Sequence, residues 1–471
     1  MAKQLDDAVV WLTFIHMNDI YEMMPVSGGA LGGVARVATL KQQLLAENPN
    51  TFLTMAGDLH GPSALGLAEV NGDLLAGKQN IAVMNKVGID FATFGDHEFD
   101  IYSAAAHRAR LAETQFPMIS SNVFDADGNP LPGVSVNQIV TVTNSAGASV
   151  KVGFFGATKP IPRSAIPITH VDYAEAAAKQ VAALADQVDI LIAITHFNVA
   201  DDCAVVEAHP EIDLILGGDD HQHMKAEPGA GLAPIFKADS NARSVQLIDL
   251  YYDTASDTLR IEDRLQPITD AIAADPVVKA EVDQWVQRGY DGFRAKGIEP
   301  TKVIATLSVD LDGFANSVRN HPTELTRLMV RGIHKTATEP ELSFMFSALI
   351  RLDDIIPAGG NFAMYDVIRT FPNNYDIVTI DLPGAALKFV LDFGQNAKGS
   401  GQYILSTPNV TQNDQQQWQI DGQPLDEERT YRVGTTAEIV RDFTTIGARL
   451  VETHPLTLQQ LLVQELAATF G

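Results

Sequence analysis

The chain has 471 residues, with 33 Lys and Arg against 59 Asp and Glu, which gives a formal net charge of −26. At roughly 150 residues per domain, this length predicts two or three domains. An acidic surface repels nucleic acid and anionic membranes, so the charge argues against both as partners. The single cysteine, Cys203, excludes an intramolecular disulfide framework and a cysteine-cluster zinc site. A metal centre in this chain must therefore use Asp, Glu and His.

The N-terminal region gives no sign of a targeting segment. An apolar run at residues 9–15 follows one lysine and two aspartates, and it is too short and wrongly flanked for a signal peptide. No segment of the sequence reaches the ~20 apolar residues that a membrane-spanning helix needs. The sequence predicts a soluble cytoplasmic protein, with a trimmed export signal as the open alternative, and a monomer.

The first half of the chain repeats a pattern of short apolar runs, each followed by a polar stretch and an Ala-rich segment typical of helices. The runs fall at residues 9–15, 51–56, 91–94, 151–156, 189–195 and 212–218. Alternating strands and helices predict an α/β layered domain over residues 1–265. Since the carboxyl ends of parallel strands meet at one edge, we expect the residues after these runs to converge on one edge of a sheet.

The pattern changes after residue 265. Residues 266–300 place apolar side chains about one turn apart and predict a connecting helix. Helical periodicity at residues 324–337 and strand patterns at 341–350, 375–382 and 430–436 then alternate with turn-rich segments. They predict a smaller α+β domain over residues 301–471, in which the polar stretch 411–419 forms a loop.

Five runs of the first half end in residues that can bind metals. These are Asp19, Asp58, Asp96 with His97, His196, and Asp219 with His221. A single Asp after a strand is usually a helix cap or turn residue, and a single His is usually a satisfied surface or core residue. Five such endings in succession do not fit that explanation. Crowded carboxylates repel one another unless cations lie between them, so the pattern predicts divalent metals.

The motifs that carry these residues also resemble a known family. HMNDIY (residues 16–21), GDLHGPS (57–63), GDHEFD (95–100), THFN (195–198) and GGDDH (217–221) are similar, in order and spacing, to motifs of calcineurin-like metallophosphoesterases of the 5'-nucleotidase type. ALIRLDD (348–354) resembles the C-terminal domain of that family more faintly. The resemblance implies a layered metallophosphoesterase catalytic domain followed by a smaller α+β 5'-nucleotidase C-terminal domain, which binds substrate.

The resemblance also implies roles for individual residues. Asp19, Asp58 and His221 would hold one divalent cation, and Asp58, Asp96, His196 and Asp219 a second, with Asp58 bridging. An alternative alignment pairs His221 with His223 and leaves Asp219 out. Tyr21 stands where many members have a histidine ligand, so it is either a ligand or a neighbour of one. His97 would act on the phosphate or the leaving oxygen, and Asp100 would orient its ring.

In the second domain the resemblance assigns substrate contacts to Arg351, with Tyr403 and Phe443 as candidates for stacking on a base. A guanidinium binds anions in a bidentate manner, although a surface ion pair is the alternative for Arg351. A core position is the alternative for Phe443. The aromatic motifs of the family are altered here, so we expect a weak clamp on the base.

Together these features predict a dinuclear metal-dependent phosphoester hydrolase. Its expected substrates are nucleoside 5'-monophosphates or related phosphomonoesters, attacked by metal-bound hydroxide. The alternatives are cleavage of cyclic nucleotides or nucleotide sugars on the same fold, and a catalytically weak protein that only binds metal or a phosphorylated ligand. Four aspartate ligands favour Mn²⁺ or Mg²⁺ over Zn²⁺. The expected partner is a small phosphorylated molecule, and neither a nucleic-acid polymer nor a membrane.

Overall fold

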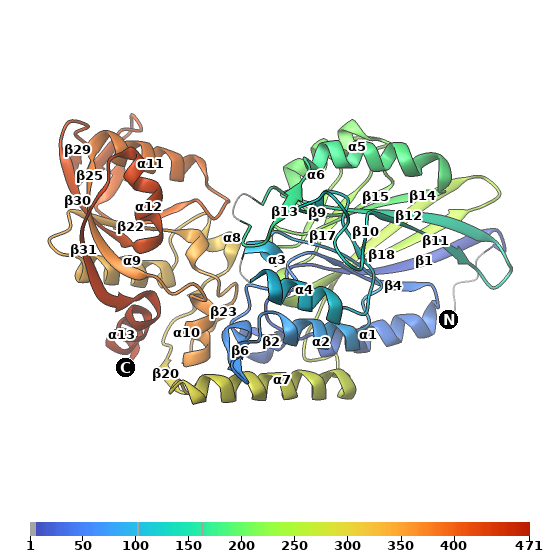
Figure 1. Ribbon diagram of the computed structural model, residues 1–471, viewed down its shortest axis with the longest axis horizontal. Coiled ribbons are helices and arrows are strands. Elements are labelled where there is room, and N and C mark those ends of the chain that lie inside the picture. Colours follow the sequence, from blue (N-terminus) through green and yellow to red (C-terminus); the bar gives the residue numbers. More distant parts are fainter. Residues whose placement is uncertain (1–5, 101–102, 162–163) are drawn as a thin grey trace. The chain divides into compact units, whose positions relative to one another are not determined.

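The computed structural model describes residues 6–100, 103–161 and 164–471, without the side chains of Asp100, Arg441 and Asp442. The chain forms two compact units, Met1–Phe293 and Arg294–Gly471 (Figure 1). Within the described ranges, none of the helices combines the length and the apolar character needed to span a bilayer.

Two large sheets form the centre of the first unit. The seven-stranded sheet contains, in spatial order, β10 (Val134–Ser135), β8 (Met118–Ile119), β7 (Phe91–Thr93), β4 (Thr51–Ala56), β1 (Val9–Met17), β18 (Ser244–Asp253) and β19 (Thr258–Pro267). The six-stranded sheet contains β11 (Asn137–Thr143), β12 (Ser149–Thr158), β14 (Ile190–His196), β15 (Leu214–Gly217), β17 (Ile235–Lys237) and β16 (Met224–Ala226). The strands from β10 to β1 run parallel, as do those from β12 to β17.

The two sheets pack face to face around one apolar core. Phe14 of β1 and Phe91 of β7 meet Phe154 of β12 in this core, and the rings of Phe91 and Phe154 stack at a centroid distance of 4.2 Å. Helices cover the outer faces (Figure 1). They are α1 (Val34–Glu47), α2 (Lys78–Val87), α3 (His97–Asp100) and α4 (Ala104–Glu113) beside the first sheet, and α5 (Tyr173–Leu184) and α6 (Val199–Ala208) beside the second. The unit is thus an α/β layered domain, as predicted.

One expectation about this unit is wrong. The runs at residues 9–15, 51–56 and 91–94 form strands of the seven-stranded sheet, whereas those at 151–156, 189–195 and 212–218 form strands of the other sheet. The predicted ligands therefore follow strand ends of two facing sheets and not one edge of a single sheet. The runs are apolar on both faces, so local sequence does not determine which strands pair with one another.

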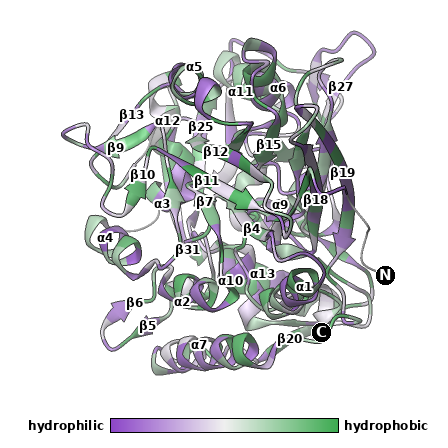
Figure 2. Ribbon diagram, turned by 90° about the vertical axis from the view of Figure 1, so that its right-hand side faces the viewer, coloured by the Kyte–Doolittle hydropathy of each residue, from purple (hydrophilic) through white to green (hydrophobic). Residues whose placement is uncertain are grey.

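Helix α7 (Pro276–Ala295) lies within residues 266–300, where the sequence predicts a connecting helix. Hydrophilic and hydrophobic residues alternate along it (Figure 2), and Val278, Val282 and Trp285 are buried. A Cβ atom at Gly289 would collide with Leu65, so the absence of a side chain allows the helix to approach this part of the first unit closely. Small two-stranded sheets, β2 (Pro25–Val26) with β3 (Leu31–Gly32), β5 (Glu69–Val70) with β6 (Asp73–Leu74) and β9 (Val123–Asp125) with β13 (Ile168–His170), complete the unit.

The second unit is an α+β domain around a five-stranded sheet. In spatial order this sheet contains β26 (Ile404–Ser406), β22 (Leu342–Phe346), β30 (Thr430–Thr436), β25 (Asp376–Pro383) and β31 (Arg449–Thr457). Helices α9 (Glu324–Thr336) and α13 (Leu458–Phe470) contribute to one apolar core, and α11 (Gly384–Asn396) contributes to another. Shorter elements are α8 (Ala315–Val318), α10 (Met364–Thr370), α12 (Val440–Phe443), β20 (Val303–Thr306) with β24 (Asn361–Ala363), β21 (Leu311–Asp312) with β23 (Ile355–Ile356), and the β27 (Val410–Gln412), β28 (Trp418–Ile420), β29 (Gln423–Pro424) sheet.

Candidate metal centre

Five predicted ligands lie at the carboxyl ends of parallel strands from both sheets of the first unit. They are Asp19 after β1, Asp58 after β4, Asp96 after β7, His196 at the end of β14 and Asp219 after β15. The facing sheets bring these strand ends together, because β4 and β7 of one sheet lie against β12, β14 and β15 of the other. Side chains separated by up to 200 positions in the sequence therefore form one cluster.

His196 lies at the centre of this cluster. Its Nε2 atom is 3.6 Å from an oxygen of Asp58 and of Asp96, and 3.9 Å from an oxygen of Asp19 and of Asp219. Three groups bring their ligand atoms within 4.8 Å of one another: Asp19, Asp58 and His196; Asp58, Asp96 and His97; and Asp96, His196 and Asp219. Asp58, Asp96 and His196 each belong to two groups, so the arrangement can hold neighbouring cations that share ligands.

The orientation of the His196 ring is fixed by a backbone contact. Its Nδ1 atom lies 2.8 Å from the carbonyl oxygen of Ala56, which can only accept a hydrogen bond, so Nδ1 donates. That contact directs Nε2 into the cluster, where neither Nε2 nor the Asp96 Oδ1 atom has a hydrogen-bond partner among the described residues. A buried nitrogen and a buried carboxylate oxygen without hydrogen bonds fit metal ligation, and a second hydrogen bond on the far nitrogen is typical of metal-binding histidines.

The loops that carry the ligands have an uncommon backbone conformation. Asp19 and Asp58 have φ of 54°, His221 has φ of 60° and Asp219 has φ of 76°. Positive φ in residues other than glycine costs free energy, and it persists where the surrounding structure holds it in place. Such strain at four predicted ligands indicates that these loops are shaped for the site.

Two glycines make room for the ligands. A Cβ atom at Gly57 would collide with Nδ1 of His196, and one at Gly95 would collide with a carboxylate oxygen of Asp58. Gly57 also has a φ of 77°, which glycine adopts readily. In each of these Gly-Asp pairs, the aspartate is a predicted ligand and the glycine leaves the space that a neighbouring predicted ligand occupies.

Tyr21 connects the two sides of the cluster. Its hydroxyl lies 3.0 Å from Asp19 Oδ1, 2.7 Å from Asp58 Oδ2 and 2.9 Å from Nε2 of His221. His221 is buried and its Nε2 also lies 3.4 Å from Asp19. His223, by contrast, is exposed. The structure thus brings Asp219 and His221 to the cluster, which favours the alignment that pairs them.

His97 lies at the rim of the cluster. Its backbone N–H donates to Asp58 Oδ1 at 3.1 Å, its ring Nε2 is 4.0 Å from Asp58 Oδ2, and its side chain is 21% exposed. An imidazole with access to solvent, next to a predicted bridging carboxylate, can reach a bound substrate. The side chain of Asp100, which the sequence pairs with His97, lies outside the described residues.

Charge inside the cluster is compensated by nearby cationic groups. Burial opposes the charged form of His196, but Asp58 and Asp19 outweigh it and raise the pKa of His196 well above its ordinary value. Burial likewise opposes ionisation of Asp96 and Asp58, yet the pKa of each lies below its usual range because histidines, and for Asp96 also Lys159, surround it. The pKa of Asp19 is raised, mainly by burial. The site therefore attracts positive charge.

Sequence reasoning missed three charged residues that shape the site. Lys159 follows β12 and its ammonium pairs with Asp96 and Asp219. Lys237, wholly buried, donates to the carbonyl groups of Phe197 and Gly218, which flank two ligand loops.

Glu98 accepts from the backbone N–H groups of three consecutive residues, 58–60. Burial and then Asp58 raise the pKa of Glu98 to about 7. A lysine three residues after the apolar run 151–156 was the signal available for Lys159.

The predicted substrate residues of the second unit differ in their surroundings. Arg351 is half-buried, and its backbone N–H donates to Thr370. Tyr403 is partly buried against the core that α9 and α13 share. Phe443 is only 8% exposed and packs on Phe344 and Phe346 in the other core. This packing agrees with the core position that the sequence offers as the alternative for Phe443, and it leaves the ring little access to a base.

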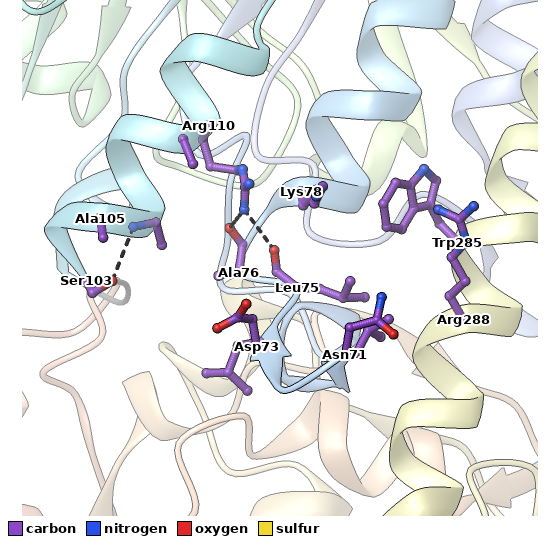
Figure 3. Close-up of a pocket in the computed structure, with 14 residues that line it drawn as sticks. Asn71, Asp73, Leu75, Ala76, Lys78, Ser103, Ala105, Arg110, Trp285 and Arg288 are labelled. Atoms are coloured by element: carbon purple, nitrogen blue, oxygen red, sulfur yellow. Dashed lines mark hydrogen bonds between the residues drawn. The ribbon is translucent and has the colours of Figure 1, made fainter.

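A cavity of about 960 Å³ lies elsewhere in the first unit (Figure 3). The β5–β6 hairpin, α4 and α7 form its walls, and Arg110 donates to the carbonyl groups of Leu75 and Ala76 beside it. The guanidinium of Arg288 lies over the ring of Trp285, 4.7 Å from its centroid. None of the predicted metal ligands is among the described residues that line this cavity, so it is separate from the metal centre.

Comparisons with known proteins agree with this architecture. Residues 12–223 match the calcineurin-like phosphoesterase family, and residues 303–441 match the 5'-nucleotidase C-terminal domain. A snake venom 5'-nucleotidase from Naja atra is 23% identical over 351 residues, which are 68% of this chain and 63% of that protein. A 5'-nucleotidase from Rattus norvegicus is 26% identical over 58% of this chain and 52% of its own length. The matched part thus spans between half and two thirds of these relatives.

Solved structures show the same fold. The crystal structure of a 5'-nucleotidase precursor from Thermus thermophilus superposes with a TM-score of 0.76 at 19% identity, over 98% of this chain and 96% of that one. Both matched families occur here in the order that the sequence predicted, each in a separate compact unit. The chain belongs to the family in which a calcineurin-like phosphoesterase domain precedes a 5'-nucleotidase C-terminal domain.

Proposed function

We propose that this protein is a metal-dependent hydrolase of phosphomonoesters, with nucleoside 5'-monophosphates as its substrate class. The observation that carries the proposal is the convergence of four aspartates around one buried histidine nitrogen that has no hydrogen-bond partner within the described part of the chain. Calcineurin-like phosphoesterases bind divalent metals, and the relatives named above are 5'-nucleotidases, which act on small phosphorylated substrates.

The proposed centre holds two divalent cations. Asp19, Asp58 and His221 would hold one of them, and Asp58, Asp96, His196 and Asp219 the other. Such cations supply Lewis acidity to a phosphoryl oxygen and lower the pKa of bound water.

The remaining groups would bind, position and transfer protons. His97, at the rim, would donate to the phosphate or to the leaving oxygen. Glu98 would hold the loop of Asp58 through its backbone N–H groups. Arg351 would contact an anionic group of the substrate through its guanidinium.

The ligand set favours hard cations. Four carboxylates offset the four positive charges of two divalent ions, and oxygen ligands suit Mn²⁺ and Mg²⁺ better than Zn²⁺. We expect Mn²⁺ to activate the enzyme best and the activity optimum to be alkaline, because anionic ligands reduce the acidity of a bound water. The double change Asp96→Asn with Asp219→His should shift the metal preference towards Zn²⁺ and the optimum towards neutral pH. Equal profiles for the two proteins would contradict this ligand assignment.

The test of the function is a turnover assay with metal analysis. Metal-free protein is reloaded with Mn²⁺, Mg²⁺ or Zn²⁺ and assayed against nucleoside monophosphates, a simple aryl phosphate, a cyclic nucleotide and a nucleotide sugar. Metal-dependent release of phosphate from the monophosphates supports the proposal, and Asp58→Asn should abolish it. Turnover of only the cyclic nucleotide or the nucleotide sugar would favour diester cleavage on the same fold. Bound metal without turnover of any substrate would favour a binding protein.

A further inference from the structure

Lys159 reaches into the metal centre from the end of β12. Its Nζ atom lies 3.3 Å from Asp96 Oδ1 and also pairs with Asp219 Oδ1. Its backbone N–H donates to the carbonyl group of His196 at 3.0 Å, which fixes the start of the side chain beside the central ligand. The ammonium group therefore lies between two of the carboxylates assigned to the second cation.

The other half of the centre is different. Within the described part of the chain, the ion pairs of Asp19 and Asp58 are all with histidines. These carboxylates thus meet imidazole rings, which can become neutral and coordinate a metal. Asp96 and Asp219 pair with His196 too, but they also face a lysine ammonium, a compact positive charge that cannot act as a ligand.

An ammonium group and a divalent cation compete for the same two carboxylates. The Lys159 ammonium lies against one oxygen of each carboxylate, with Asp96 as an ion pair that lacks a hydrogen bond, and two positive charges a few ångströms apart repel. The Lys159 side chain is 31% exposed and flexible, so it can move towards solvent when a cation enters. The cost of that movement falls on the second cation only.

We infer that Lys159 acts as a built-in competitor for the second cation, so that the two metal positions differ in affinity and the second fills only when metal is abundant. The inference rests on the proposed function, because it uses the same ligand assignment. It adds a form of regulation: Lys159 would neutralise Asp96 and Asp219 at low metal concentration and give way at high concentration.

Calorimetric titration of metal-free protein with Mn²⁺ tests this inference. For the wild type we expect one tight step and a second step weaker by on the order of 100-fold. In Lys159→Met the second step should tighten by at least about tenfold, while the first changes little. Lys151→Met is the matched control, since it removes the same charge from an exposed position on the same strand and should titrate like the wild type.

A spectroscopic measurement checks the same point without calorimetry. The electron paramagnetic resonance signal of a coupled Mn²⁺ pair should appear at a lower metal-to-protein ratio in Lys159→Met than in the wild type. Lys159→Gln serves as the second neutral variant if the methionine protein folds poorly, and Lys159→Arg, which keeps the charge, should preserve the separation of the two steps.

The outcomes separate the inference from the proposed function. Two wild-type steps of equal affinity, or an unchanged separation in both neutral variants, would overturn the role of Lys159 and leave metal-dependent hydrolysis intact. An unchanged metal titration together with weaker binding of inorganic phosphate would also overturn it, and would place Lys159 at the substrate. Absence of any Mn²⁺ binding by the wild type would overturn the proposed metal centre itself.

Discussion

His97 is the residue whose role depends most on its position relative to the cations. It lies at the rim, with its ring 4.0 Å from Asp58 and partly open to solvent. If it acts on the phosphoryl group, His97→Ala should reduce kcat by on the order of 10²–10⁴ while the metal content stays unchanged. Steady-state kinetics and metal analysis on the same preparation decide the matter. Loss of metal would indicate a ligand, and an unchanged kcat would exclude both roles.

His221 and His223 provide a direct test of the ligand assignment. His221 is buried beside Asp19 and Tyr21, whereas His223 is exposed and its backbone N–H donates to Asp239. We expect His221→Ala to weaken binding of the first cation by at least about tenfold, since loss of even an outer contact of a metal site costs that much. His223→Ala should bind metal like the wild type. Both variants are titrated with metal side by side. Weaker binding in His223→Ala, with wild-type binding in His221→Ala, would reverse the assignment.

Residue chemistry explains what the sequence could predict about the centre. Asp19, Asp58 and His196 were identifiable because each ends an apolar run and only Asp, Glu and His could serve as ligands in this chain. Lys159 also follows such a run, but a lysine is not a ligand, and its role depends on two carboxylates brought close by the other strands. Phe443 could not be assigned from sequence, because stacking and packing require the same type of side chain.

At the scale of elements, the strands were predictable and their pairing was not. The run at residues 51–56 coincides with β4, and the run at 430–436 coincides with β30. Assignment to two sheets depends on contacts between distant parts of the chain, which a local pattern does not contain. The polar stretch 411–419, predicted as a loop, includes the ends of the β27–β28 hairpin, because strand pairing here uses the backbone and not an apolar pattern.

His16 of β1 links the two sheets below the metal centre. Its Nε2 lies 2.9 Å from the carbonyl oxygen of Gly217 on β15, so Nε2 donates, and Nδ1 accepts from the Thr54 hydroxyl of β4 at 3.0 Å. Acceptance at Nδ1 requires the neutral ring, whereas the Nε2 bond to Gly217 is compatible with either protonation state. Complete burial is the main cause that lowers the pKa of His16 from 6.5 to about 4.

This buried ring predicts a dependence of stability on pH. Between pH 6.5 and about 4 the ring stays neutral in the folded protein but becomes protonated in the unfolded chain, so unfolding takes up a proton. Its contribution to the free energy of unfolding, about 3 kcal/mol, is present above pH 6.5 and is lost as the pH falls towards 4. In His16→Gln, proton uptake on unfolding should decrease by one. Urea denaturation of metal-free protein across this pH range measures the slope, and equal slopes in both proteins would refute the prediction.

At the scale of the whole molecule, the predicted metal ligands and the predicted substrate contacts belong to different units. All six predicted metal ligands come from Met1–Phe293, whereas Arg351 and Tyr403 come from Arg294–Gly471. The family and its two-domain order were predictable because they depend on motifs that are continuous in the sequence. The selectivity among bases was not predictable, because it depends on which aromatic side chains of the second unit remain accessible.

The burial of Phe443 leads to an expectation about base selectivity. Phe443 lies in the core, so of the two predicted stacking residues Tyr403 alone is still a candidate. A clamp of these two rings on a base is therefore not expected. Stacking of a base on an aromatic side chain contributes ~1–3 kcal/mol, so a single ring discriminates weakly. We expect kcat/KM for adenosine, guanosine and uridine monophosphates to differ by less than about tenfold, or roughly 1.4 kcal/mol.

Tyr403→Ala should lower all three values by similar factors, with Phe389→Ala, an exposed aromatic of the same unit, as the control. A preference of more than about 100-fold for one base would contradict this expectation, because it would require base-specific hydrogen bonds in place of stacking.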